Sequence, residues 1–410
     1  MKDRRVSPFK AESFQGMNNI AVKSKGSLEI PSMILNANVE PDGSLQRRPG
    51  LEKIINLPGA HSLWTNNAGI VLCMAQREIY RVIDTATTVQ LVDTVQPDAP
   101  MSYFEVDGRI YMSNKNWTGM YDPLQDVMKA WGEPVPDAPI VVPAAGSLPV
   151  GRYQVCITTL SEYGRTSGNS NLSIIVLDEP GGISIPNLPA TASVWITDPN
   201  GANLLFAGNS SPITDVPENS EPIPTMWGSP PLPMNHMCWA LGRAWGCVGK
   251  KVYYSEPYQP ELFLLSTNFF DLSDPVLMIA RAGSGLFVGC EAKTDLFAGT
   301  DPATMTQTTV GKGVVPGTLS YATDLGDMGR DVPIWVGKDG VYAGLRDGRA
   351  VNLIKEKVQI DPQQSTGASV CRVKDGRRQM LFSARQNMKG QEVGFGDNAS
   401  CEVIRKGAVI

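Results

Sequence analysis

Short apolar stretches recur along most of the chain, and turn residues separate each stretch from the next. Many follow one pattern, in which a polar turn precedes an aliphatic–aromatic pair and then a small residue. Copies occupy residues 108–113, 250–255, 293–299 and 338–344. Such runs between turns are typical of strands joined in hairpins. We therefore expect an all-β protein.

The aromatic residue of this pattern returns at nearly constant spacing in the second half of the chain. Tyr253, Phe297 and Tyr342 lie 44 and 45 residues apart, close to the length of one four-stranded propeller blade. A repeat of this size cannot bury its own apolar face and must pack on neighbouring repeats. The spacing therefore predicts a β-propeller of about six or seven blades.

The repeat is interrupted between Tyr111 and Tyr253, where 142 residues pass without a copy. Residues 134–139 are proline-rich and indicate a stiff linker. Alternating strands at 151–158 and 192–197 follow, with turn signals between them, as in a small β-sandwich. Exposed loops between strands tolerate insertions well. We predict that a small fibronectin-like β-sandwich interrupts the propeller.

These patterns give five expected segments. They are an extended N-terminal lead-in and ring closure (1–60), the first part of the propeller (61–138), the inserted sandwich (139–232), the second part of the propeller (233–386) and a C-terminal tail or closing strand (387–410).

The net charge and the lengths of the apolar stretches argue against nucleic-acid binding and against a membrane span. The 36 Lys and Arg residues against 41 Asp and Glu residues give a net charge of −5, without the basic footprint that nucleic-acid binding needs. No stretch approaches the roughly 18 apolar residues of a membrane span. The basic N-terminus has no apolar segment behind it, so we expect no signal peptide.

Few residues suggest catalytic or metal chemistry. The seven cysteines are scattered, without a C-x-x-C pair, so we expect them to be small hydrophobic residues in a reducing compartment. The two histidines, His61 and His236, are too few for a three-histidine metal site, and each precedes apolar strand sequence. A structural role is expected for both.

Two further motifs resemble functional sites only superficially. The glycine-bearing residues 280–285 lack the Gly-Lys-Ser/Thr ending of a phosphate loop. The carboxylate pairs Asp271 with Asp274 and Asp324 with Asp327 lack the spacing of a calcium loop. We therefore predict no catalytic residues, no metal site and no cofactor.

A small set of residues could instead contact partner chains. The three tryptophans of this set lie in loop-like sequence next to proline or glycine, where tryptophan is enriched at interfaces, although burial at a blade edge is an equal alternative. Arginine pairs could form ion pairs between subunits or lie as solvated charges in turns. The candidate interface residues are Arg47, Arg48, Trp117, Trp131 and Trp227.

Three stretches together resemble bacteriophage tail proteins of the nozzle (tail tubular protein B-like) type. They are residues 14–19 with 36–39 and 42–50, residues 151–167 with 198–201, and residues 251–261. The resemblance implies a propeller interrupted by a small β-domain, in a structural virion protein that forms a ring or attaches to one. It brings no catalytic residues with it.

We therefore expect a non-enzymatic structural protein of a phage tail, either a nozzle or a tail-tip or baseplate component. It would be made in the host cytoplasm and assembled into the virion as a homo-oligomer with other tail proteins, acting in assembly and genome delivery. The alternatives are a receptor- or glycan-binding propeller module, which could contact the host surface, and a polysaccharide-degrading propeller enzyme.

Overall fold

The computed structural model describes most of the chain and divides it into two compact units. The described residues are 13–14, 30, 37–40, 42–47, 55–83, 88–92, 95, 98–161, 164–217, 221–325, 328–354, 364–374, 377–386 and 398–405. One unit is Leu57–Ser273, and the other combines Met1–Asn56 with Asp274–Ile410. Apart from a short 3₁₀ helix at Pro302–Thr304, the elements named along the described chain are β-strands.

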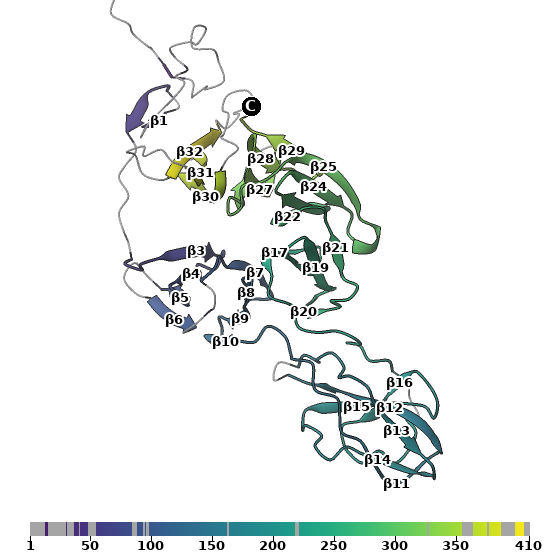
Figure 1. The fold of residues 1–410 in the computed structure, drawn as a ribbon. Coiled ribbons are helices and arrows are strands. Elements are labelled where there is room, and N and C mark those ends of the chain that lie inside the picture. Colours follow the sequence, from purple (N-terminus) through teal and green to yellow (C-terminus); the bar gives the residue numbers. More distant parts are fainter. Residues whose placement is uncertain are drawn as a thin grey trace, which may run out of the picture. The chain divides into compact units, whose positions relative to one another are not determined.

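The unit Leu57–Ser273 contains three sheets in which consecutive strands pair antiparallel (Figure 1). The first comprises β3 (Ala60–Thr65), β4 (Val71–Ala75), β5 (Glu78–Val82) and β6 (Thr88–Val92). The second comprises β7 (Ser102–Val106), β8 (Arg109–Ser113), β9 (Thr118–Asp122) and β10 (Val127–Lys129). The third comprises β17 (Asn235–Ala240), β18 (Arg243–Val248), β19 (Lys251–Glu256) and β20 (Gln259–Phe263), with β21 (Phe269–Asp271) also paired to β19.

Two-residue turns join several of these strands. Asp107 and Gly108 have φ values of 51° and 72°, and Leu241 and Gly242 have 55° and 69°. Two positive φ values in succession are those of the type I′ turn, whose twist matches that of paired strands. Asp107 and Gly108 therefore form such a turn between β7 and β8.

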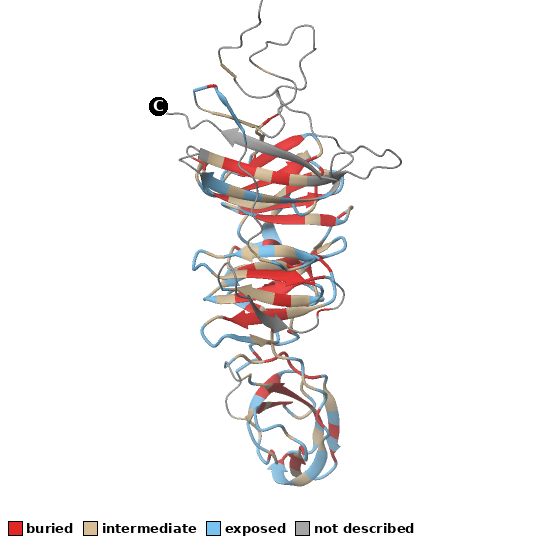
Figure 2. Ribbon diagram, turned by 90° about the vertical axis from the view of Figure 1, so that its left-hand side faces the viewer, coloured by how far each residue is buried: buried red, intermediate tan, exposed pale blue. Residues whose placement is uncertain are grey.

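Successive sheets of this unit pack through their apolar faces. One buried cluster joins β4 and β5 to β8 and β9, with Leu72 and Ile110 both 0% exposed. A second cluster joins β7 and β8 to the third sheet and contains Tyr111 and Phe263. Figure 2 shows the buried residues concentrated in the strands of the sheets.

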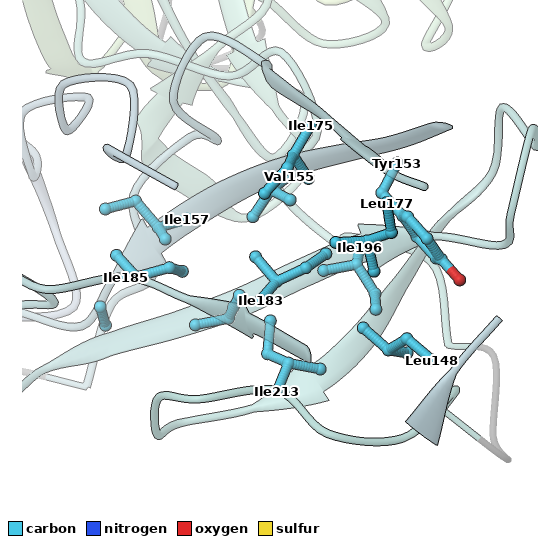
Figure 3. Close-up of a cluster of buried hydrophobic side chains, with 12 residues drawn as sticks. Leu148, Tyr153, Val155, Ile157, Ile175, Leu177, Ile183, Ile185, Ile196 and Ile213 are labelled. Carbon is cyan, nitrogen blue, oxygen red and sulfur yellow. The ribbon is translucent and has the colours of Figure 1, made fainter. Parts of the chain in front are cut away.

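The strands between β10 and β17 form a β-sandwich. The larger sheet has the order β13-β12-β15-β16 and comprises β12 (Gly151–Thr159), β13 (Ser173–Leu177), β15 (Ala192–Thr197) and β16 (Leu204–Gly208). The smaller sheet pairs β11 (Val142–Leu148) with β14 (Gly181–Ser184). A core of aliphatic side chains around Tyr153 fills the space between the two sheets (Figure 3).

The second unit contains two further four-stranded antiparallel sheets, a three-stranded one and a short hairpin. The first four-stranded sheet comprises β22 (Val276–Ala282), β23 (Gly285–Cys290), β24 (Lys293–Ala298) and β25 (Thr306–Lys312). The second comprises β26 (Ser320–Asp324), β27 (Arg330–Gly337), β28 (Gly340–Gly344) and β29 (Ala350–Asn352). The three-stranded sheet is β30 (Gln364–Lys374), β31 (Arg377–Gln386) and β32 (Asn398–Arg405). The hairpin is β1 (Ala37–Val39) with β2 (Leu45–Arg47).

Sheets in this unit also pack face to face. Phe287 of β23 contacts Trp335 of β27, with ring centroids 5.4 Å apart. A second buried cluster joins β27 and β28 to Met380 and Phe382 of β31. Six blade-type sheets and one sandwich thus occur in the described residues, which confirms an all-β propeller interrupted by a sandwich.

Candidate interaction surfaces and the joint of the sandwich

The five residues predicted to contact partners lie in different surroundings. Arg47 ends β2 and is exposed, whereas Arg48 lies outside the described residues. Trp227 is 54% exposed, and its backbone has a φ of 61°. The Trp227 amide donates to Asn169 Oδ1 at 2.6 Å, which holds the backbone of this exposed residue.

The other two tryptophans are directed into the chain. Trp131 is 2% exposed, and its indole Nε1 donates to the carbonyl of Pro260 at 2.9 Å. Trp117 is half-buried and packs against the cluster that joins the first two sheets. Trp227 is thus the tryptophan of the three with most of its side chain free to meet a partner.

Glu261 lies where the sandwich meets the blades. Its side chain is 12% exposed, and its Oε1 accepts a hydrogen bond from Tyr111 Oη at 2.6 Å. Arg165 Nη1, from the sandwich, lies 3.6 Å from Glu261 Oε2. Burial, followed by the charge of Glu261 and the hydrogen bond to it, raises the pKa of Tyr111 far above its usual range. One carboxylate therefore ties together β8, β20 and the sandwich.

Close backbone contacts complete this joint. Ser229 and Phe263 exchange two backbone hydrogen bonds of 2.9 Å, and Thr225 Oγ1 donates to the carbonyl of Ser167 at 2.5 Å. A Cβ atom at Gly168 would lie 1.6 Å from the carbonyl oxygen of Gly228. Ser229 thus ties the segment that follows the sandwich to β20, and Thr225 and Gly228 of the same segment pack on the sandwich loop that holds Ser167 and Gly168.

His61 has partners that the sequence did not indicate. Its Nε2 lies 2.7 Å from Asp98 Oδ1, and its Nδ1 lies 2.8 Å from Ser62 Oγ. These residue types occur in catalytic triads, but a template triad places the serine at Nε2 and the carboxylate at Nδ1. Ser62 Oγ also accepts the amide of Met101 at 2.9 Å. The cluster therefore links β3 to the segment that precedes β7.

The second unit holds an apolar pocket of about 260 Å³, lined by residues of β26, β27, β30 and β31. Ile334 and Met380 contribute apolar surface, and Arg372 contributes a charge. Arg372 Nε donates to Gln379 Oε1 at 2.8 Å, and burial raises the pKa of the neighbouring Cys371 thiol to about 11. Nothing in this lining assembles a nucleophile with a base.

Two searches for special sites gave negative results in the residues that the structure describes. No group of three or more His, Cys, Asp or Glu residues is placed to hold a metal ion. Within the same part of the chain, we find no helix whose length and apolarity would let it span a bilayer.

Comparisons with known proteins return only distant structural similarity. No protein-family model matches the chain, and no curated protein matches it either. The chain is similar to BBS1N solved in complex with ARL6DN, with 8% identity over 87% of this chain and 96% of that one, at a TM-score of 0.36. It is also similar to the Pan2 WD40 domain of Neurospora crassa (9% identity, 79% and 86% coverage, TM-score 0.34) and to apo AztD from Citrobacter koseri (9%, 79% and 82%, 0.34). TM-scores this low do not support the fold by themselves, so the propeller is identified from the sheets described above.

Proposed function

We propose that this chain is a structural, non-enzymatic subunit of a bacteriophage tail, in the nozzle or at the tail tip or baseplate. It is an interaction module in which blades form a frame and the sandwich is a second contact domain. Its work is done through interfaces with other copies and other tail proteins during assembly and genome delivery. The supporting observation is the joint around Glu261, which holds the sandwich on the blades at a defined position.

A fixed joint is what a scaffold requires, because a protein that acts by shape must keep its contact surfaces in register. A flexible tether would need few contacts between sandwich and blades. Here a buried carboxylate joins the sandwich to the blades, and the segment that follows the sandwich is held to β20 by two backbone hydrogen bonds and to the sandwich by a glycine contact.

Purified virions of the phage that encodes this chain provide the test. Mass spectrometry of washed particles is expected to detect the chain at a fixed ratio to the other tail proteins. Antibody labelling in electron micrographs is expected to mark the tail. Absence of the chain from infectious particles would refute the proposed function.

A receptor- or glycan-binding role is the second candidate, because two exposed aromatic residues lie in turns. Trp227 is 54% exposed and Tyr258 is 77% exposed, and aromatic rings of this kind stack on sugars and on partner side chains. The purified chain would then bind host cells by itself, and a Trp227→Ala, Tyr258→Ala variant would not. Equal retention of both proteins on cells would argue against this role.

A further inference from the structure

The first edge of the larger sandwich sheet is an unprotected strand, β13. This strand pairs with β12 on one side, and no other described element forms a sheet with its outer edge. At its start the Ser173 hydroxyl donates to the carbonyl of Pro139, whereas Ile174 and Val176 remain 54% and 55% exposed. Natural edge strands are usually protected by charges, prolines or strong bulges. The sequence Ser-Ile-Ile-Val-Leu of β13 has no charged residue and no proline.

The opposite edge of the same sheet, β16, is also an uncharged strand with an exposed apolar side chain. It pairs with β15 and with no other described strand, and it is five residues long, as β13 is. Its sequence Leu-Leu-Phe-Ala-Gly is also uncharged, and Phe206 is 39% exposed. A register shift lies near Gly208, which leaves Leu204 to Phe206 as the regular part of the strand.

The exposed apolar side chains at the two edges lie on one face of the sheet. Ile174 is opposite Gln154, and Val176 is opposite Arg152, whereas Ile175 between them lies in the sandwich core. Cys156, two residues along β12 from Gln154, packs with Trp195 on this same outer face. The Phe206 ring contacts Trp195, with centroids 5.2 Å apart. The outer face therefore has an exposed apolar group at each end.

Strand direction makes the two edges complementary. Each strand of the order β13-β12-β15-β16 is antiparallel to its neighbour, so β13 and β16 run in opposite directions. A second copy set beside the first in the same orientation brings its β16 antiparallel to β13. Because side chains alternate between faces, an in-phase register places Phe206 opposite Ile174 or Val176. Both exposed apolar groups are then covered at once.

We infer that the sandwich joins a second copy of this chain head to tail, with β16 of one copy added to the edge of β13 of the next. This inference rests on the interaction module proposed above and names its partner. Head-to-tail interfaces generate rings when the rotation closes and filaments when it does not. A two-fold pairing of β13 with itself would cover Ile174 and Val176 but would leave the edge of β16 and Phe206 uncovered.

Mass photometry of the full chain and of edge variants tests this interface. The wild type is expected to form a discrete oligomer larger than a dimer. The Ile174→Lys, Val176→Lys variant introduces charges on the exposed face of β13, and it is expected to shift at least tenfold toward monomer. Leu124→Lys is the matched control, because Leu124 is 95% exposed on the turn between β9 and β10 and belongs to a blade. It should assemble like the wild type.

Cysteine crosslinking distinguishes the two ways of pairing. The Ile174→Cys, Phe206→Cys and Val176→Cys, Phe206→Cys variants cover the two in-phase registers, and one of them is expected to form disulfide-linked ladders. The single variants Ile174→Cys and Val176→Cys are expected to stay unlinked. A linked dimer of a single variant, a monomeric wild type, or lysine variants that still assemble would each overturn the inference. Circular dichroism of every variant confirms that the β-fold is retained.

The inference and the proposed function fail separately. Oligomers that depend on β13, formed by a chain that is absent from virions, would remove the tail role and keep the interface. A chain present in virions whose edge variants still assemble would keep the tail role and remove this interface.

Discussion

At the scale of single residues, the most consequential side chain is Glu261. This role could not be predicted from local sequence, because the hydrogen bond of Glu261 to Tyr111 spans 150 positions of the chain. Likewise, the flanking prolines and glycines of Trp131 and Trp227 look alike in the sequence, yet one ring is 2% exposed and the other 54%. Local sequence identifies a loop, but burial depends on which distant strand packs over it.

Removing the Glu261 carboxylate is expected to weaken the joint. In Glu261→Ala, the Tyr111 hydroxyl loses its acceptor and Arg165 loses its ion pair, at a cost of about 1 to 3 kcal/mol in the free energy of unfolding. Urea denaturation measures this cost, and limited proteolysis between the sandwich and β17 should become faster. Glu105→Ala, at an exposed position of β7, is the control. Equal stability of the two variants would show that the joint does not depend on this carboxylate.

His236 is expected to make stability depend on pH. Burial lowers the pKa of His236 to about 4, below the value of about 6.5 for an unfolded histidine. Between these two values the unfolded chain binds more protons, so stability is complete above pH 6.5 and decreases as the pH falls toward 4. The difference between these two pKa values corresponds to a loss of about 1 to 3 kcal/mol across this range.

The check is urea unfolding of the wild type and His236→Gln at pH 7 and pH 4.5. The wild type should lose more stability than the variant on acidification. Parallel losses in the two proteins would show that other groups cause the acid sensitivity.

At the scale of elements, the blades were predictable and the contacts between them were not. The hairpin at Asp107–Gly108 and the strands around Tyr253, Phe297 and Tyr342 follow from turn residues and alternating apolar positions. The turn at Gln76 and Arg77 has no glycine, although both residues have positive φ values of 51° and 73°. Here the pairing of β4 with β5 imposes a backbone conformation that local sequence does not indicate.

The contact between Gly168 of the sandwich and Gly228 of the segment that leads to β17 is expected to be intolerant of a methyl group. In Gly168→Ala the new Cβ would meet the carbonyl oxygen of Gly228 at 1.6 Å, so the backbone must shift, at a cost of about 1 to 3 kcal/mol or more. Gly311→Ala is the matched control, because its Cβ would lie 3.5 Å from the nearest atom, on Tyr342. Thermal unfolding compares the two variants, and equal midpoints would contradict the close packing at this joint.

At the scale of the whole molecule, the blades and the sandwich are β-domains with different roles. The blades are repeats that stabilise one another face to face, as the shared clusters around Tyr111 and Trp335 show. The sandwich has its own core, so it can present its edges to a partner without losing its fold. The spacing of the repeats and the gap between them predicted this layout from the sequence. The identity of the partners depends on surfaces that only assembly brings together.

Cryo-electron microscopy of purified virions is the decisive test of a structural role in the tail. We expect density for the propeller blades and the sandwich in the tail, repeated around the tail axis, with β16 of one copy beside β13 of its neighbour. Tails complete in density but without this chain would contradict the proposed role.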